Sequence, residues 1–183
     1  MKCDLCRISR AVCNPLLENN GTGKVLIVVS QPDKRDDVEG MIYASKNGKL
    51  LKGLLLEAGI ADYTITGATR CAPTTWLTGD EDKCNIHLKK VLHAKEWDAI
   101  IALGNAALRV LTKKSGMKKW RGKPIPLHKD YSKDCLIMAT YGIEDYLEYP
   151  TYRNIIVRDL RNSLEKGEPD AVEFIRWKIG MKL

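Results

Sequence analysis

Four short runs of strand-like residues, separated by longer segments of helical character, constrain the fold of this chain most strongly. Three are nearly unbroken by polar residues, namely "KVLIVV" (24–29), "WDAIIALG" (97–104) and "DCLIMATY" (134–141), and the fourth, "DYTITGATRC" (62–71), alternates and is rich in threonine. Unbroken β-branched runs are typical of strands that are buried on both faces. Helical segments between such strands indicate parallel crossovers. The pattern predicts an α/β fold with a central, mostly parallel, four-stranded sheet covered by helices on both faces.

The segments between these runs have the periodicity of amphipathic helices. We expect helices over 47–60, 80–94, 105–114 and 153–167. Polar loops are expected over 30–37 and 142–150, and a turn-rich basic stretch over 115–130. In open parallel sheets, ligands bind at the carboxyl ends of the strands, so functional residues are expected just after each strand.

The length of 183 residues favours one domain, 1–183, with an N-terminal cysteine segment over 1–23 and a C-terminal helical extension over 168–183. No apolar run approaches the roughly 18 residues that a membrane span needs. The N-terminus also lacks the long apolar stretch of a signal peptide. We therefore expect a monomeric cytoplasmic protein, from a prokaryotic cell or a virus-infected host, that has no membrane partner.

The formal net charge is +7. A charge of this size suggests a polyanionic partner such as nucleic acid, but ordinary solubility explains it equally well. Charge alone leaves both explanations open.

The six cysteines, at positions 3, 6, 13, 71, 84 and 135, indicate metal ligation or packing rather than disulfides in a reducing compartment. Cys3 and Cys6 form a CxxC pair, and twelve residues separate Cys71 from Cys84. Four thiolates suit either zinc or a [4Fe–4S] cluster. Structural zinc sites more often show two close pairs, so the spacing favours a cluster. Simple burial of Cys71 and Cys84 remains an alternative, and Cys135 is expected to pack inside a strand.

The order of these motifs resembles a known family. The CxxC pair is followed by "CNPLLENNGTGKVLIV", a proline-containing loop, "GKLLKGLLLEAGI", "YTITGATRCAP", "CNIHL", "ALGNAALRVL" and "RGK". This series is similar to the iron–sulfur, family 4-type uracil-DNA glycosylases from residue 3 to about residue 160. The resemblance implies a three-layer α/β/α sandwich and a pocket for an extruded DNA base. It also implies a [4Fe–4S] cluster held by Cys3, Cys6, Cys71 and Cys84, with zinc as the alternative metal.

The resemblance also assigns the site residues, and several depart from the pattern of the family. In the first motif, Pro32, Asp36 and Asp37 match, whereas Ser30 replaces the pocket glutamate. Tyr43 keeps the aromatic ring that stacks on the base. Gly67 replaces the asparagine that reads the pyrimidine edge, and Gly142 replaces the histidine that stabilises the departing base.

These replacements all remove volume and polar groups. Losing one oxyanion-type donor costs roughly 3 kcal/mol of transition-state stabilisation, so plain uracil becomes a poor substrate. We predict a widened pocket formed by Gln31, Tyr43, Gly67 and Gly142. The catalytic candidates are Ser30, Asp36 and Asp37. Glu144 and Asp145, in the last loop, are further acids that could polarise water.

The basic stretch "KKSGMKKWRGK" (113–123) resembles the loop that approaches DNA in the family. We predict phosphate contacts from Lys118, Lys119, Arg121 and Lys123, which surround Trp120. The alternative is an ordinary solvated face.

Three hypotheses of function follow. The first is a DNA glycosylase, a hydrolase of N-glycosyl bonds, which excises a modified or bulky pyrimidine rather than plain uracil. The second is a catalytically inactive iron–sulfur relative that still binds DNA. The third is a zinc-containing interaction module unrelated to DNA.

Overall fold

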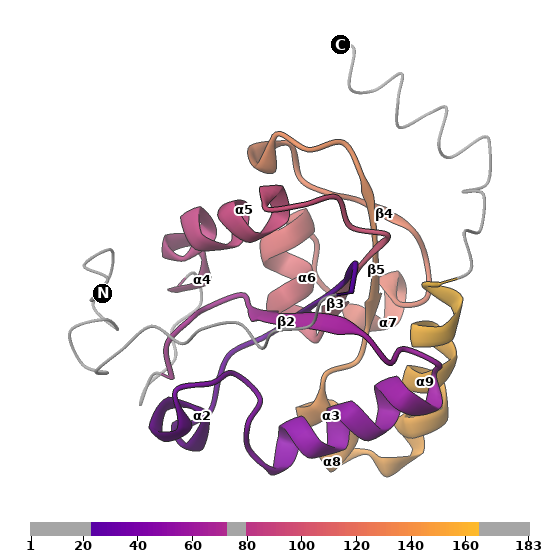
Figure 1. The fold of residues 1–183 in the computed structure, drawn as a ribbon. Coiled ribbons are helices and arrows are strands. Elements are labelled where there is room, and N and C mark those ends of the chain that lie inside the picture. Colours follow the sequence, from indigo (N-terminus) through magenta and orange to yellow (C-terminus); the bar gives the residue numbers. More distant parts are fainter. Residues whose placement is uncertain (1–22, 73–79, 165–183) are drawn as a thin grey trace.

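The computed structural model describes residues 23–72 and 80–164. Within them a single five-stranded sheet has the strand order β2-β1-β3-β5-β4 (Figure 1). The strands are β1 (Val25–Val29), β2 (Tyr63–Gly67), β3 (Ala99–Leu103), β4 (Ile125–Pro126) and β5 (Leu136–Thr140). The pairs β2–β1, β1–β3 and β3–β5 are parallel, and β4 pairs with β5 in the antiparallel direction. The prediction of a mostly parallel sheet is therefore confirmed.

Helices cover both faces of the sheet. Figure 1 shows α5 (Asn85–His93) and α6 (Asn105–Thr112) on one side, and α3 (Lys46–Glu57) and α9 (Arg153–Asn162) on the other. The shorter helices are α2 (Lys34–Glu39), α4 (Asp80–Lys83), α7 (Met117–Trp120) and α8 (Ile143–Glu148), with 3₁₀ turns η1 (Lys129–Tyr131) and η2 (Pro150–Tyr152). The result is the predicted three-layer α/β/α arrangement.

Strand β1 shows why a central strand of the sheet needs an unbroken apolar run. Leu26 and Val28 belong to the apolar cluster beneath α5 and α6. Ile27 and Val29 belong to the cluster beneath α3 and α9. Because successive side chains of a strand point to opposite faces, both sets of positions must be apolar in a central strand.

The prediction of four strands was one short. Strand β4 lies in the stretch expected to be only turns and basic residues, because "KPIP" has the composition of a turn. It has two residues and includes Pro126. Proline is tolerated there because β4 is at the edge of the sheet, where one side of the strand needs no donor.

Two predicted polar loops contain short helices. Helix α2 begins after Asp33, whose side chain accepts hydrogen bonds from the backbone N–H groups of Arg35 and Asp36. Helix α8 begins after Gly142, whose N–H donates to the Asp145 carboxylate at 2.8 Å. Each helix has only six residues, which is too short to show a clear hydrophobic period. Only their capping residues could have indicated these helices in the sequence.

Two further boundaries differ from the sequence prediction. The helix expected over 80–94 is divided at Cys84 into α4 and α5. Strand β5 begins at Leu136, so the half-buried Cys135 precedes the strand rather than lying inside it. The predicted N-terminal segment, apart from Gly23, and the predicted helix over 168–183 lie outside the described residues.

Candidate active site at the strand ends

The carboxyl ends of β1, β3 and β5 meet at Ser30, Gly104 and Gly142. The Ser30 hydroxyl donates a hydrogen bond to the carbonyl oxygen of Leu103 at 3.4 Å. A Cβ atom on Gly104 would lie 2.7 Å from Ser30 Oγ and 3.6 Å from Gly142 Cα. Gly104 also has φ +88°, a conformation that side chains disfavour. Glycine at position 104 therefore lets the three strand ends approach one another closely.

Asp36 holds the backbone of two segments that follow β1. It is buried, and its carboxylate accepts hydrogen bonds from the N–H groups of Asp33 and Ser45, both at 3.1 Å. These bonds connect the β1–α2 turn to the start of α3. The Ser45 hydroxyl is also buried and has no hydrogen-bond partner among the described residues.

The positions of the other residues predicted in the first motif say little about a catalytic role. Gln31 follows Ser30 directly after β1 and is half-buried. Asp37 lies in α2, and the structure does not describe its side chain. The catalytic assignments of Ser30, Asp36 and Asp37 therefore remain predictions.

Tyr43 is held in an unusual backbone conformation against α3. Its φ is +55°, and only 3% of the residue is exposed. A Cβ atom on Gly48, a buried residue of α3, would lie 1.6 Å from the Tyr43 carbonyl oxygen. Glycine at position 48 is therefore what allows Tyr43 to pack here. Since the ring is covered, a base could stack on it only after neighbouring side chains move.

The Tyr43 hydroxyl lies beside the Glu144 carboxyl group and interacts with it. Burial raises the pKa of Tyr43 well above its usual value, and the negative charges of Glu144, Asp36 and Asp33 add to this shift. The Glu144 residue as a whole is exposed, yet desolvation of its carboxyl group raises its pKa. Repulsion by Asp145 and Asp33 adds to that rise of the pKa, while the backbone N–H of Glu144 and the Tyr43 hydroxyl oppose it. The site is thus a cluster of acids around one tyrosine.

The space beside Gly142 is occupied by Glu144. A Cβ atom on Gly142 would lie 2.8 Å from Glu144 Oε2 and 3.4 Å from Gly104 Cα. The space beside Gly67 is occupied by backbone, because a Cβ atom there would lie 2.1 Å from the Thr69 carbonyl oxygen. The prediction that these glycines widen the pocket is therefore not supported at either position, since other parts of the chain fill the volume.

The basic stretch lies at the β5 side of the same edge, since the N–H of Gly122 donates to the carbonyl of Ala139 in β5. Lys118, Lys119 and Lys123 are exposed there. Lys119 Nζ lies 5.1 Å from the ring centroid of Trp120. This position agrees with a surface that faces a ligand bound at the strand ends.

Arg121 has a different environment from these lysines. Its guanidinium pairs with Asp159 of α9, a residue only 3% exposed, and Arg121 Nε donates to Asp159 Oδ2 at 2.9 Å. The Thr140 hydroxyl donates to the same Asp159 oxygen at 2.8 Å. Arg121 therefore ties the basic stretch to β5 and α9, and the prediction of phosphate contacts rests on the lysines.

Cys71 and Cys84 are both buried, close to the carboxyl end of β2 and to the start of α5, which packs against β2. Two buried thiols on adjoining elements fit half of a four-cysteine ligand set. Cys3 and Cys6, the other predicted ligands, lie outside the described residues. Across 23–72 and 80–164, no three or more His, Cys, Asp or Glu side chains are grouped to hold a metal ion.

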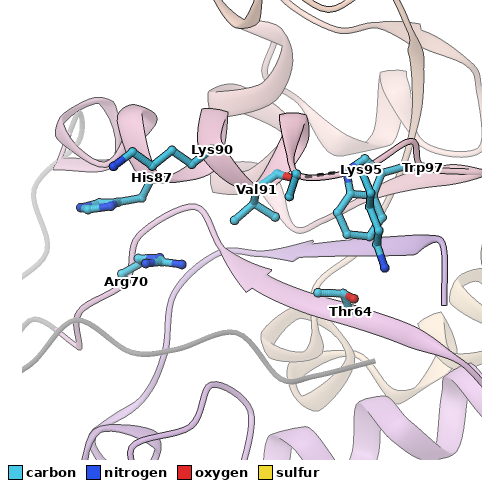
Figure 2. Close-up of a pocket in the computed structure, with 8 residues that line it drawn as sticks. Thr64, Arg70, His87, Lys90, Val91, Lys95 and Trp97 are labelled. Atoms are coloured by element: carbon cyan, nitrogen blue, oxygen red, sulfur yellow. Dashed lines mark hydrogen bonds between the residues drawn. The ribbon is translucent and has the colours of Figure 1, made fainter. Parts of the chain in front are cut away.

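A groove that sequence reasoning missed runs along the outer edge of β2, beneath α5. Figure 2 shows Arg70, His87 and Lys90 at one end, and Lys95 and Trp97 at the other. Its volume is about 330 Å³. Lys95 Nζ donates to the Gly23 carbonyl at 2.6 Å and lies 4.6 Å from the Trp97 ring centroid. The residues come from β2, α5 and the segment before β3, so no single sequence motif could have revealed this groove.

The fold and the site define an α/β protein whose candidate site lies at the carboxyl ends of parallel strands, where ligands bind in folds of this kind. The family model described as "Uracil DNA glycosylase superfamily" matches residues 18–161, and the chain belongs to this superfamily. The recognition made from the sequence motifs is confirmed.

Two relatives are similar to most of the chain. A type-4 uracil-DNA glycosylase of Saccharolobus solfataricus is 28% identical over 176 residues, which cover 90% of this chain and 81% of the relative. A type-4 uracil-DNA glycosylase of Thermotoga maritima is 30% identical over 132 residues, which cover 68% of this chain and 69% of the relative. Of the helices in the described residues, none is both long and apolar enough to cross a membrane.

Proposed function

We propose that this chain is a DNA glycosylase, which hydrolyses the N-glycosyl bond between a base and its deoxyribose during DNA repair. The observation that supports it most is the superfamily membership combined with the junction of Ser30, Gly104 and Gly142. A glycosylase of this kind acts on a nucleotide extruded from the stack. The strand-end edge offers polar and acidic groups where such a base would enter.

The proposed substrate is a modified pyrimidine rather than plain uracil. The support is the change of polar groups, because Ser30, Gly67 and Gly142 stand where the resemblance implies a glutamate, an asparagine and a histidine. The space beside Gly67 is filled by the Thr69 carbonyl, and the space beside Gly142 by Glu144. The proposal therefore rests on the changed polar groups and not on added room for the base. Tyr43 and Gln31 would be the nearest partners of the base from the first motifs.

The second candidate function is that of a DNA-binding relative without catalytic activity. One observation favours it. Both carboxylate oxygens of Asp36 accept backbone hydrogen bonds, so this predicted catalytic acid has a structural role in the described structure.

Release of free base separates the two candidates. Purified protein is incubated with single- and double-stranded oligonucleotides that carry uracil, 5-hydroxymethyluracil or thymine, and abasic sites are then cleaved with alkali. The glycosylase proposal expects cleavage at 5-hydroxymethyluracil, little at uracil and none at thymine. Binding without cleavage of any substrate would favour the inactive relative. Efficient release of uracil would contradict the proposed substrate but not the activity.

For DNA binding, we propose that Lys118, Lys119 and Lys123 contact phosphates. Such contacts are independent of sequence and weaken steeply with salt. Reversing the three charges to glutamate should weaken binding to all sequences alike and flatten the salt dependence. Lys129→Glu is the matched control, because Lys129 is exposed and precedes β5, at the opposite end of the strand. Equal losses in both variants would mean that the basic stretch has no special role.

We also propose that Cys3, Cys6, Cys71 and Cys84 hold a [4Fe–4S] cluster. Protein purified without oxygen should contain iron and sulfide, and Cys84→Ala should lose both. Cys135→Ala is the control, because Cys135 is a half-buried cysteine just before β5 that is not a predicted ligand and should leave the cluster intact. Tightly bound zinc in place of iron would favour the alternative metal.

For the protein as a whole, we propose a single domain over 1–183 that is monomeric and cytoplasmic. The named relatives come from prokaryotes, which supports a prokaryotic cell as its setting over a virus-infected host. Sedimentation of the full chain tests the oligomeric state.

A further inference from the structure

We propose that Glu144 is a catalytic residue of the strand-end site, and that its carboxyl group contacts the departing base from the space beside Gly142. This inference rests on the proposed glycosylase function and names the group that would carry its chemistry. Glu144 belongs to a segment that the sequence predicted to be a loop, so its place in the first turn of α8 was not foreseen.

The geometry at the start of α8 places this carboxyl group at the junction of the strands. Gly142 is the N-cap of α8, and Glu144 follows in the first helical turn. Glu144 Oε2 lies 2.8 Å from the position of a Cβ atom on Gly142, and Gly104 Cα is 3.4 Å from the same position. The carboxyl group therefore occupies the place from which a side chain at residue 142 would reach the site.

The charged and titratable groups around Glu144 favour its neutral form. Asp33 faces it from the N-cap of α2, Asp145 from α8 itself, and Tyr43 from the segment before α3. Asp36 acts on the same cluster through Tyr43. Burial and the two neighbouring aspartates raise the pKa of Glu144, against the opposing effects of its own backbone N–H and of the Tyr43 hydroxyl.

A neutral carboxyl group can donate a hydrogen bond, whereas a carboxylate can only accept one. The Tyr43 hydroxyl interacts with the Glu144 carboxyl group and so restricts the directions that this group can take. The proton of the neutral acid can then be directed toward a ligand.

The neighbouring acids are less suited to this role. Asp36 accepts backbone hydrogen bonds from Asp33 and Ser45. Asp145 accepts from the backbone N–H of Gly142 at 2.8 Å and caps α8. Glu144 Oε2 lies nearest to the position of a Cβ atom on Gly142, at 2.8 Å, whereas Asp145 Oδ2 is 3.5 Å from it.

The proposed step is balanced as follows. The bond between C1′ of the sugar and N1 of the pyrimidine breaks, and both electrons go to the base, where O2 gains negative charge. The Glu144 O–H donates a hydrogen bond to this oxygen without giving up its proton. Water forms the new bond to C1′, and the proton that it loses passes through solvent to the ring nitrogen of the base. The products are an abasic site and the free base, and Glu144 is unchanged.

The first test is single-turnover release of 5-hydroxymethyluracil from DNA across a range of pH. The wild-type rate should fall as pH rises through the raised pKa of Glu144, because the donor is then lost. Glu144→Ala should lower the rate about 100-fold, the typical loss for one donor of this kind. Glu144→Gln should keep part of the rate and lose this pH dependence, since an amide donates a hydrogen bond but does not titrate. Glu39→Gln, at an exposed acid of α2, should behave like the wild type.

The second test does not require turnover. It measures binding to DNA that contains the 2′-fluoro analogue of 5-hydroxymethyldeoxyuridine, relative to the same DNA with thymidine. The wild type should prefer the analogue more strongly at acidic pH, Glu144→Gln should prefer it independently of pH, and Glu144→Ala should lose the preference. If no base is released but this pattern holds, the glycosylase function fails while the contact from Glu144 stands. If Glu144→Ala releases or binds the base as the wild type does, the proposal for Glu144 is overturned.

Discussion

The ends of β2 and β5 are built differently, although each has a glycine where the resemblance implies a polar side chain. At Gly67, at the end of β2, the adjoining space is filled by the backbone carbonyl of Thr69, 2.1 Å from a Cβ position. At Gly142, after β5, it is filled by the carboxyl end of Glu144, at 2.8 Å. One site is closed by backbone and the other by a side chain that can rotate.

This difference shows that glycine in place of a polar side chain has different structural consequences at the two strand ends. At the β2 end the backbone itself fills the space, so a longer side chain requires the backbone to shift. At the β5 end a polar side chain fills the space, and side chains hold this end on two sides. Glu144 lies against Gly142, and Asp159 of α9 accepts a hydrogen bond from Thr140, just before Gly142.

The largest expected effect concerns the side chains that hold the β5 end. Asp159→Ala leaves Arg121, which is 18% exposed, without its partner, and removes the acceptor of Thr140. Breaking a buried pair in this way costs about 3–5 kcal/mol. Urea denaturation measures the loss. Asp134→Ala is the control, at an exposed acid just before β5. A loss under about 1 kcal/mol would mean that the β5 end does not depend on these side chains.

Gly67→Asn tests the backbone-closed end. The new side chain meets the Thr69 carbonyl, so the chain between β2 and Cys71 must shift. Overpacking of this kind costs typically about 1–3 kcal/mol, and we expect the upper end because the obstacle is backbone. The same denaturation assay measures it. Unchanged stability would show that this segment moves easily, and the contrast with Gly142 would disappear.

Gly48→Ala tests whether α3 holds Tyr43, and through it Glu144, in place. The added methyl group would lie 1.6 Å from the Tyr43 carbonyl oxygen, so we expect a loss of about 2 kcal/mol from overpacking. Gly53→Ala is the matched control in the same helix. Gly53 is exposed with nothing within 4 Å of its Cβ position, so alanine should stabilise α3 by about 0.5–1 kcal/mol. Stabilisation by both substitutions would contradict the proposed packing.

The smallest expected effect is that of Gly142→Ala. Its methyl group meets only the mobile end of Glu144 at close range, and φ −77° suits alanine. Stability should therefore change by no more than about 0.5 kcal/mol. A crystal structure of the variant should show the Glu144 carboxyl group turned away from the strand ends. A loss as large as that of Gly67→Asn would mean that the two ends are equally rigid.

Strand β1 and helix α3 were predicted correctly because the order of apolar and polar residues within each segment matches its burial pattern. The run 25–29 is apolar at every position, which only a strand between two layers requires. In α3, Leu51, Leu54 and Leu55 are buried at the spacing of one helical face. The short elements α2, α8 and β4 were missed because six or two residues carry too little periodicity to outweigh their polar, proline and glycine content.

The amino-acid sequence by itself determined the α/β class, the family and the positions of the cysteines, because periodicity and motif order are properties of the chain. Only the tertiary structure decided what fills the space around the glycines. The carbonyl oxygen of Thr69 fills the space beside Gly67, and the carboxyl group of Glu144, from the first turn of a short helix, fills the space beside Gly142. Such contacts depend on turns of a few residues, and turns this short leave no repeating hydrophobic pattern in the sequence. The structure also decided that Arg121 pairs with Asp159, 38 residues away, because packing of α9 on the sheet brings them together.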